Sequence, residues 1–133
     1  MLQGVNWLGV DAAKLAAMAV GSLWYSPLMF MKRWQAELGK TPEQMDNSML
    51  AVGNSVVMYL IAAVGLSVVL DWKGVVSIGD ALMTSGAIWL VFVGSIELMH
   101  DRYNGASAAF SLINCGNTLT AFLAMGAVIQ LLS

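Results

Sequence analysis

Two charged side chains stand in an otherwise apolar stretch of this 133-residue chain, and their types and spacing could do chemistry. Asp11 and Lys14 are three residues apart, so on a helix they share one face and can pair as ions. Tyr25 continues the same face. Two interpretations are open. One is an ion or proton relay, or a polar substrate site, inside a helix bundle. The other is a self-neutralising pair that reaches towards the nearby surface.

Further along the chain, an apolar stretch has a polar middle formed by Asn114, Asn117, Thr118 and Thr120. Amide and hydroxyl side chains hydrogen-bond between helices in lipid, for about 0.6 kcal/mol each. The same groups could line a hydrophilic path. The pattern favours contacts that join helices, with the polar path as the alternative.

Glu97 and His100 have the Glu-x-x-His spacing that di-iron helix bundles use. Such a site needs two of these motifs and two further glutamates, and the other glutamates, Glu37 and Glu43, lie outside the apolar stretches. The single cysteine, Cys115, excludes an intrachain disulfide, a Cys-x-x-Cys redox pair and a cysteine zinc site. We therefore expect no catalytic residue, no metal and no cofactor, with His100 at the membrane interface.

Helices must position these residues, because four stretches of the chain are long and apolar enough to cross a bilayer. They cover approximately residues 5–26, 42–70, 80–100 and 106–132, and a crossing helix needs about 20 apolar residues. Hydrophobic residues make up 59% of the sequence and charged residues 11%, which leaves little for a soluble domain. The sequence predicts one all-α domain, residues 1–133, folded as a four-transmembrane-helix bundle in a lipid bilayer. The net charge of −2 argues against a nucleic-acid partner, which needs a basic surface.

The connection between the first two spans is predicted to hold a short helix of its own. Pro27 ends the first span, because proline lacks the amide donor and disfavours a helical residue before it. Residues 28–38 place apolar and polar side chains on different sides, which predicts an interfacial amphipathic helix with Gly39 as its C-cap. Thr41, Pro42 and Gln44 form a capping pattern from which the second span should begin.

The distribution of lysine and arginine predicts how the chain crosses the membrane. The first and third loops hold four basic residues, Lys32, Arg33, Lys40 and Arg102, whereas the opposite side holds only Lys73. Basic residues are enriched in cytoplasmic loops. Both termini and the loop at 71–79 should therefore lie outside, and the loop at 100–105 in the cytoplasm.

Small and polar residues predict which helix faces pack. Gly9, Ala13, Ala17 and Gly21 are each four residues apart and form a ridge, expected at a contact within the chain or between copies. Two spans also carry a seam at coiled-coil spacing. The seam of the second span is Ala51, Ser55, Met58, Ala62, Gly65 and Val69. The seam of the fourth span is Ser107, Ser111, Asn114, Thr118, Ala121 and Met125.

The first third of the chain carries a family resemblance. The residues that carry it are Asn6-Trp7-Leu8, the run Gly21-Ser22-Leu23-Trp24-Tyr25-Ser26-Pro27, Phe30, Trp34 and the turn Gly39-x-Thr41-x-Glu43. With these residues the chain resembles the bacterial membrane family known as domain of unknown function seventeen-sixty-one. The resemblance implies a four-helix protein of the bacterial inner membrane, and it implies no activity.

Taken together, these patterns predict a small non-enzymatic membrane protein that works as a homo-oligomer or as a subunit beside another membrane protein. The alternative is a small oligomeric transporter or channel. Its polar path would be lined by Asp11, Lys14, Asn114 and Asn117. An enzyme ranks third, because the sequence offers no nucleophile with a base and no complete metal set.

Overall fold

The computed structural model describes residues 2–39 and 49–133, which form helices and turns and no strand. A short 3₁₀ turn, η1 (Leu2–Gly4), precedes the helices. The helices are α1 (Trp7–Trp24), α2 (Met31–Leu38), α3 (Met49–Lys73), α4 (Ile78–Ile88), α5 (Ser95–Tyr103) and α6 (Ala108–Leu131). A π-helical segment, η3 (Trp89–Gly94), joins α4 to α5, so that the three form one long rod.

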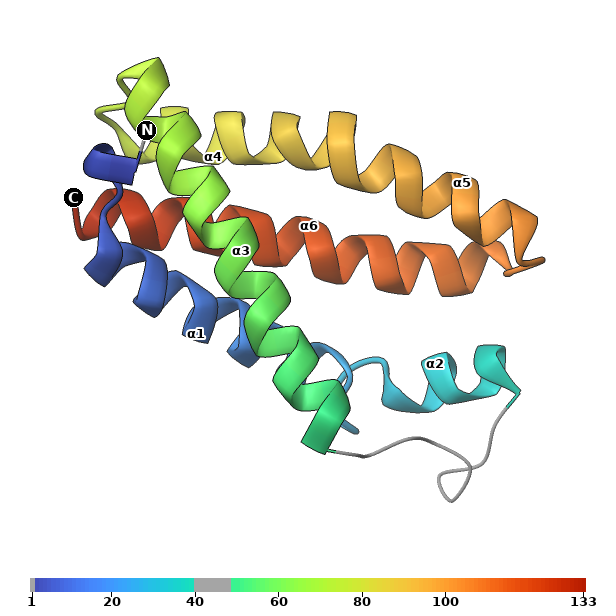
Figure 1. Ribbon diagram of the computed structural model, residues 1–133. Helices are drawn as coiled ribbons and strands as arrows, with labels where there is room; N and C mark the ends of the chain where they lie inside the picture. The colour runs from blue at the N-terminus through green and yellow to red at the C-terminus, as the bar shows by residue number, and fades with distance from the viewer. Residues whose placement is uncertain (1, 40–48) are drawn as a thin grey trace.

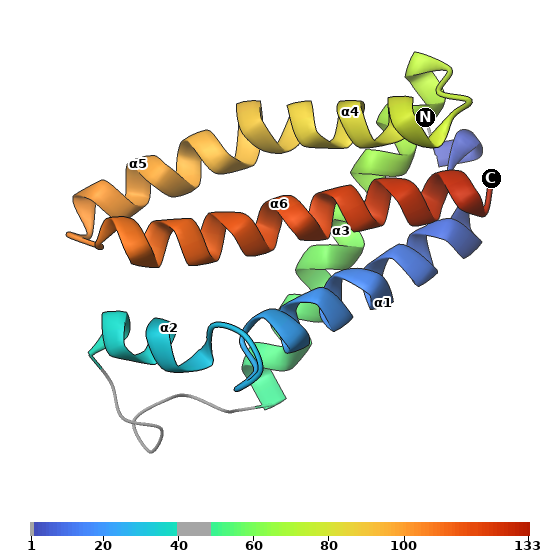
Figure 2. The same ribbon diagram turned by 180° about the vertical axis from the view of Figure 1, so that it is seen from behind.

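Helix α6 is the centre of the fold. Helix α1 lies along one side of α6 and the α4–η3–α5 rod lies along the other, while α3 crosses α1 obliquely (Figure 1). The view from behind shows α2 beside the first half of α6, following the end of α1 (Figure 2). Both termini and the α3–α4 turn lie at one end of the molecule, and the α5–α6 turn lies at the other.

Three helices are long and apolar enough to cross a membrane: Met49–Lys73, the rod Ile78–Tyr103, and Ala108–Leu131. They correspond to the second, third and fourth predicted spans. Helix α1, which corresponds to the first, is not among the three; it has 18 residues and carries Asp11 and Lys14. The predicted helix start at Thr41, Pro42 and Gln44 lies outside the described residues.

The predicted loop at 71–79 is too long, because α3 continues to Lys73 and α4 begins at Ile78. The hydroxyl of Ser77 accepts a hydrogen bond from the amide of Asp80 at 3.1 Å, which caps the start of α4. The predicted loop at 100–105 lies too early in the chain, since α5 runs through Tyr103 and Ser107 caps α6. Serine N-caps thus set both helix starts.

The short helix after the first span is confirmed as α2. Gly39 ends it in the left-handed conformation, with φ 70°, as the C-cap prediction requires. Its Trp34 ring lies 4.8 Å from the ring of Tyr25, centroid to centroid, so α2 is held against the end of α1.

Asn6 fixes the other end of α1 to its neighbours. Its side-chain oxygen accepts from the amide of Gly9 at 3.0 Å, which caps α1. Its side-chain nitrogen donates to the carbonyl of Ile129 on α6 at 3.1 Å, and its backbone amide donates to the hydroxyl of Ser67 on α3 at 3.1 Å. One residue therefore joins three helices at this end of the fold.

The predicted small-residue ridge lies inside the chain, where α1 meets α6. Ala13 and Ala17 are fully buried. A Cβ atom at Gly9 would lie 3.2 Å from Cα of Ile129, so this glycine permits a close approach of the two backbones. The sequence left open whether the ridge packs within the chain or between copies; in the structure it packs within the chain, against α6.

The predicted seam of the second span is not the buried face of α3 in this chain, although its Ala62 packs against the core. None of its six residues is buried. The buried residues of α3 are instead Ala63, Leu66, Ser67, Val68 and Leu70. Because α3 is apolar all round, its sequence pattern does not distinguish one face from another. The seam of α6 fits better, since Ser111, Ala121 and Met125 are buried.

Candidate functional site

The π-helical segment η3 places a tryptophan and a glutamate against α6. A Cβ atom at Gly94 would lie 2.7 Å from the ring of Trp89, so the indole rests on the glycine five residues later. The indole nitrogen donates to the hydroxyl of Thr118 at 2.8 Å, and that hydroxyl donates to Glu97 at 2.8 Å. Single π turns occur often at functional sites. Here the turn builds a three-residue polar contact between the rod and α6.

A second polar contact joins the end of α1 to α6. The hydroxyl of Tyr25 donates to the side-chain oxygen of Asn114. The indole nitrogen of Trp24 donates to the carbonyl of Ile113 at 2.8 Å, and a Cβ atom at Gly116 would lie 2.8 Å from the same ring. The two aromatic residues that end α1 are therefore fixed to α6, and the amide of Asn114 is engaged by Tyr25.

Asp11 and Lys14 form the expected ion pair, with 2.8 Å between the ammonium nitrogen and a carboxylate oxygen. The lysine side chain is 18% exposed and the aspartate side chain 66% exposed. The aspartate therefore faces outward, whereas the lysine side chain is largely covered by the fold. This position agrees with the interpretation of a self-neutralising pair.

Polar residues also gather at the end of the molecule that holds the α5–α6 turn. The Glu37 carboxylate pairs with Arg33 at 3.0 Å and accepts from the hydroxyl of Ser107 at 2.5 Å. The Ser111 hydroxyl accepts from Arg102 at 2.6 Å and donates to Asp101 at 2.7 Å. These contacts hold α2 and α5 to the start of α6.

The described part of the chain contains no group of three or more His, Cys, Asp and Glu side chains that could hold a metal ion. Glu97 accepts a hydrogen bond from Thr118, while His100 is exposed on α5. In this arrangement Glu97 and His100 do not form part of one metal-binding group among the described residues.

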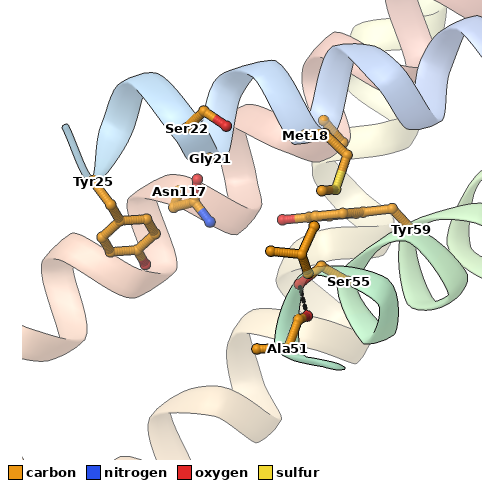
Figure 3. Close-up of a pocket in the computed structure, with 10 residues that line it drawn as sticks. Met18, Gly21, Ser22, Tyr25, Ala51, Ser55, Tyr59 and Asn117 are labelled. Atoms are coloured by element: carbon orange, nitrogen blue, oxygen red, sulfur yellow. Dashed lines mark hydrogen bonds between the residues drawn. The ribbon is translucent and has the colours of Figure 1, made fainter. Parts of the chain in front are cut away.

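A pocket opens between α1, α3 and α6, with a volume of about 300 Å³ (Figure 3). We call it the polar pocket, because hydroxyl, phenol and amide groups share its wall with small apolar residues. The residues that line it are Ala17, Met18, Gly21, Ser22, Tyr25, Ala51, Val52, Ser55, Tyr59 and Asn117. The Tyr59 side chain reaches from α3 towards α1, with Met18 beside its ring (Figure 3).

Asn117 is the most deeply buried polar side chain of the polar pocket, at 6% exposure. Its side-chain oxygen has no hydrogen-bond partner among the described residues. Leaving a buried acceptor without a partner costs about 1–3 kcal/mol. Figure 3 shows this oxygen turned towards α1 at Gly21, where a Cβ atom would lie 3.9 Å from it, at ordinary contact distance.

The polar residues singled out from the sequence fall into separate places. Asn117 and Tyr25 line the polar pocket, whereas Asp11, Lys14 and Asn114 are not part of its wall. Thr118 and Glu97 belong to the contact with Trp89. The four residues of the supposed transport path therefore do not share this one cavity.

Sequence reasoning did not select Tyr59, Ser55 or Ser22 as site residues, although all three line the pocket. A tyrosine in the middle of an apolar span was the available signal, because a phenol in lipid needs a polar partner. Ser55 was assigned to a packing seam. In the structure its hydroxyl donates to the carbonyl of Ala51 at 3.0 Å, on the pocket wall (Figure 3).

Comparison with known proteins shows that the chain matches one protein family. The family described as "Protein of unknown function (DUF1761)" matches residues 8–130, nearly the whole chain, which confirms the resemblance found in its first third. Neither the curated proteins nor the solved structures contain a match.

Proposed function

This chain belongs to the DUF1761 family of proteins of unknown function, and we propose that it is a non-enzymatic multi-pass protein of the bacterial inner membrane that works as a homo-oligomer. The proposal has three parts: four crossings with both termini outside, self-association through α3, and no chemistry of its own. Each part rests on a different observation.

The proposal of four crossings is supported by the length and course of α1. Its 18 residues extend about 27 Å at 1.5 Å per residue, close to the roughly 30 Å thickness of a hydrocarbon core. Helix α1 runs beside α6 from the end of the molecule that holds both termini, and α2 lies beside the remaining part of α6 (Figure 2). Its two charges neutralise each other at 2.8 Å, which lowers the cost of placing them in the membrane.

The orientation is supported by where the basic residues fall in the fold. Arg33 and Arg102 lie at the end with the α5–α6 turn, and Lys73 lies at the end with both termini. The Lys73 ammonium also pairs with Asp80 at 2.7 Å, so its positive charge is partly neutralised and contributes less to the charge difference between the two sides. The positive-inside rule then puts the α5–α6 turn in the cytoplasm.

The observation that carries self-association is the loose placement of α3. In its most apolar part 22% of the residues are buried, against 17% in the rod and 39% in α6, so α3 and the rod both pack loosely on the rest of the fold. An apolar cavity of about 390 Å³ separates α3 from the rod, and Gly65 and Ala62 line it on the α3 side. Small residues allow membrane helices to approach closely. We propose that a helix of a second copy packs on this face of α3.

A non-enzymatic role is supported by the separation of the two most reactive side chains. Cys115, the single thiol, is buried in α6, and His100, the single imidazole, is exposed on α5. A nucleophile needs a base within hydrogen-bond reach. The carboxylate of Glu97 lies beside this thiol, but the same carboxylate accepts a hydrogen bond from Thr118 and Cys115 is buried, so the pair is closed off from a substrate.

Mass determination of the protein purified in mild detergent tests the proposal. We expect a protein mass of at least two chains for the wild type. Gly65→Leu should reduce it to one chain, because the larger side chain would hold the second helix away. Gly53→Leu is the matched control on the same helix and should leave the mass unchanged, since at both glycines the described residues beyond the local helix place no atom within 4 Å of the Cβ position.

A wild-type particle of one chain would overturn self-association. A particle that contains one chain and a different membrane protein would replace the homo-oligomer with an accessory subunit. Equal masses for both glycine variants and the wild type would move the contact away from Gly65.

A further inference from the structure

Glu97 is an ionisable side chain within the long helical rod. The rod Ile78–Tyr103 has 26 residues and extends about 39 Å at 1.5 Å per residue, so it exceeds a hydrocarbon core of about 30 Å by about 4–5 Å at each end. Glu97 lies six residues before Tyr103, which is about 9 Å from the end of the rod. A rod centred in the bilayer therefore places this carboxyl group inside the hydrocarbon.

The described residues give this carboxyl group no counter-charge. None of the ion pairs among them includes Glu97. Arg102, the arginine on the same helix, donates to Ser111 at 2.6 Å, and His100 is exposed. The other described titratable groups that interact electrostatically with Glu97 are all acids: Tyr25 on α1, Tyr59 on α3, Cys115 on α6 and Asp101 on α5. An unpaired carboxylate is costly in hydrocarbon, whereas a carboxylic acid has no charge to bury.

The hydroxyl of Thr118 can satisfy either form of Glu97. Its oxygen lies 2.8 Å from Glu97, 2.8 Å from the indole nitrogen of Trp89 and 3.2 Å from the carbonyl oxygen of Cys115. When Glu97 is ionised, the hydroxyl donates to the carboxylate and accepts from Trp89. When Glu97 carries a proton, the acid donates to the hydroxyl, which still accepts from Trp89 and turns its own hydrogen towards Cys115. A hydroxyl group has one hydrogen and two lone pairs, so both arrangements are within its capacity.

From this arrangement we propose that Glu97 is a proton-binding site in the membrane, and that the bound proton sets the direction of the Thr118 hydroxyl. On binding, a proton from water bonds to a carboxylate oxygen; on release it returns to water, and no electron is transferred. The inference rests on the proposal that the rod crosses the membrane. It depends neither on the orientation of the chain nor on the number of copies.

A lipid-soluble carbodiimide detects a protonated carboxyl group in hydrocarbon. With N,N′-dicyclohexylcarbodiimide, the acid proton moves to one nitrogen of the reagent and the carboxylate oxygen bonds to its central carbon. The acyl group then shifts to the other nitrogen, which leaves a stable acylurea without loss of atoms. We expect one adduct per full chain in phosphatidylcholine vesicles, found by peptide mass spectrometry at Glu97 at least tenfold more often than at any other carboxyl group.

Infrared spectra of the same vesicles measure the bound proton directly. The C=O stretch of a carboxylic acid should weaken as the pH rises from about 5 to about 9. Glu97→Gln should lack this titrating band, because an amide keeps the shape of the acid and has no proton to release in this range. Glu37→Gln is the control and should keep the band, since the Glu37 carboxylate pairs with Arg33 at 3.0 Å outside the rod.

Two variants of α6 test the part played by the Thr118 hydroxyl. Hydrogen bonds to a charged group are about twice as strong as those between neutral groups, so Thr118→Val takes more from the ionised form of Glu97 than from the acid. The pH at which half of the band is lost should therefore rise by about 0.5–1 unit. Thr120→Val is the matched control, because the Thr120 hydroxyl donates to the carbonyl of Gly116 at 2.8 Å, and its midpoint should stay unchanged.

The adduct at Glu97 is located in the wild-type chain, so the main test does not depend on the folding of a variant. A wild type with no adduct at Glu97 and no titrating band would overturn the proposal, because its carboxylate would be ionised throughout. A midpoint that Thr118→Val leaves unchanged would overturn the role of the hydroxyl. A particle of one chain would end the proposed self-association and leave both results as they are.

Discussion

The contact between α4 and α6 depends on the absence of one side chain. A Cβ atom at Gly126 would lie 1.9 Å from the hydroxyl oxygen of Ser85, 3.0 Å from its Cβ and 3.2 Å from the carbonyl oxygen of Ala81. Ser85 is fully buried, and its hydroxyl donates to that same carbonyl at 2.7 Å. Gly126→Ala must therefore break this hydrogen bond or push the two helices apart.

The cost of Gly126→Ala follows from these contacts. Overpacking of a well-packed core costs about 1–3 kcal/mol, and we expect the variant to lose that much stability. The double variant Gly126→Ala with Ser85→Ala removes the 1.9 Å contact but keeps those at 3.0 and 3.2 Å, so it should recover part of the loss. Gly53→Ala is the control, because no described residue beyond its own stretch of α3 lies within 4 Å of its Cβ position.

Unfolding in mild detergent, followed by tryptophan fluorescence or circular dichroism, measures these differences. The expected order of stability places the wild type and Gly53→Ala together, the double variant below them and Gly126→Ala lowest. A Gly126→Ala protein as stable as the wild type would refute the close contact of α4 with α6. A loss of the same size in Gly53→Ala would show that glycine itself, and not the contact, is responsible.

Four further substitutions test three other contacts in the same unfolding assay. Asp11→Asn and Lys14→Met should each lower Tm, because each leaves one charge uncompensated, and the double change should recover most of the loss; two mild single variants would favour a solvated polar path. Asn6→Ala should cost about 1–3 kcal/mol, as it removes a helix cap and the hydrogen bond to Ile129, and an unchanged Tm would argue against both contacts. Thr118→Val should cost about 1–3 kcal/mol, because it leaves an indole and a carboxylate without their shared hydroxyl, and Thr120→Val serves as its control.

The sequence predicted those parts of the fold that depend on local chemistry. Gly39 ends α2 in the left-handed conformation, and the chain turns out of α1 ahead of Pro27, because both effects arise within one or two residues. The three long apolar helices were recognised from composition and length. Asp11 and Lys14 pair because residues three apart meet on any helix.

The packing of α3 could not be predicted in the same way. In lipid an apolar face may point to another helix or to the bilayer, so hydrophobicity does not select the buried side. The seam chosen at coiled-coil spacing assumed a closed bundle, whereas α3 diverges from the rod (Figure 1). The residues that are buried, such as Leu66 and Ser67, follow from contacts with η1, α1 and α6 that are distant in sequence.

The π-helical segment explains why the candidate site was recovered only in part. Residues 80–100 were predicted only as one apolar span, and the wider turn at residues 89–94 changes the direction of every later side chain. This turn brings Trp89 onto Gly94 and Glu97 to Thr118. The polar pocket was missed for a related reason, because Tyr59 and Asn117 meet only through the oblique crossing of α3.

Cysteine accessibility in intact cells tests the central claim, four crossings with both termini outside, most directly. The buried native cysteine is first replaced by Cys115→Ala, and single cysteines are then placed as Leu2→Cys, Lys40→Cys and Val76→Cys; in the structure Leu2 is 52% and Val76 87% exposed. We expect a membrane-impermeant thiol reagent to label the first and third variants and not Lys40→Cys. Labelling of Leu2→Cys and Lys40→Cys alike, or of neither, would mean that α1 does not cross and would contradict the account.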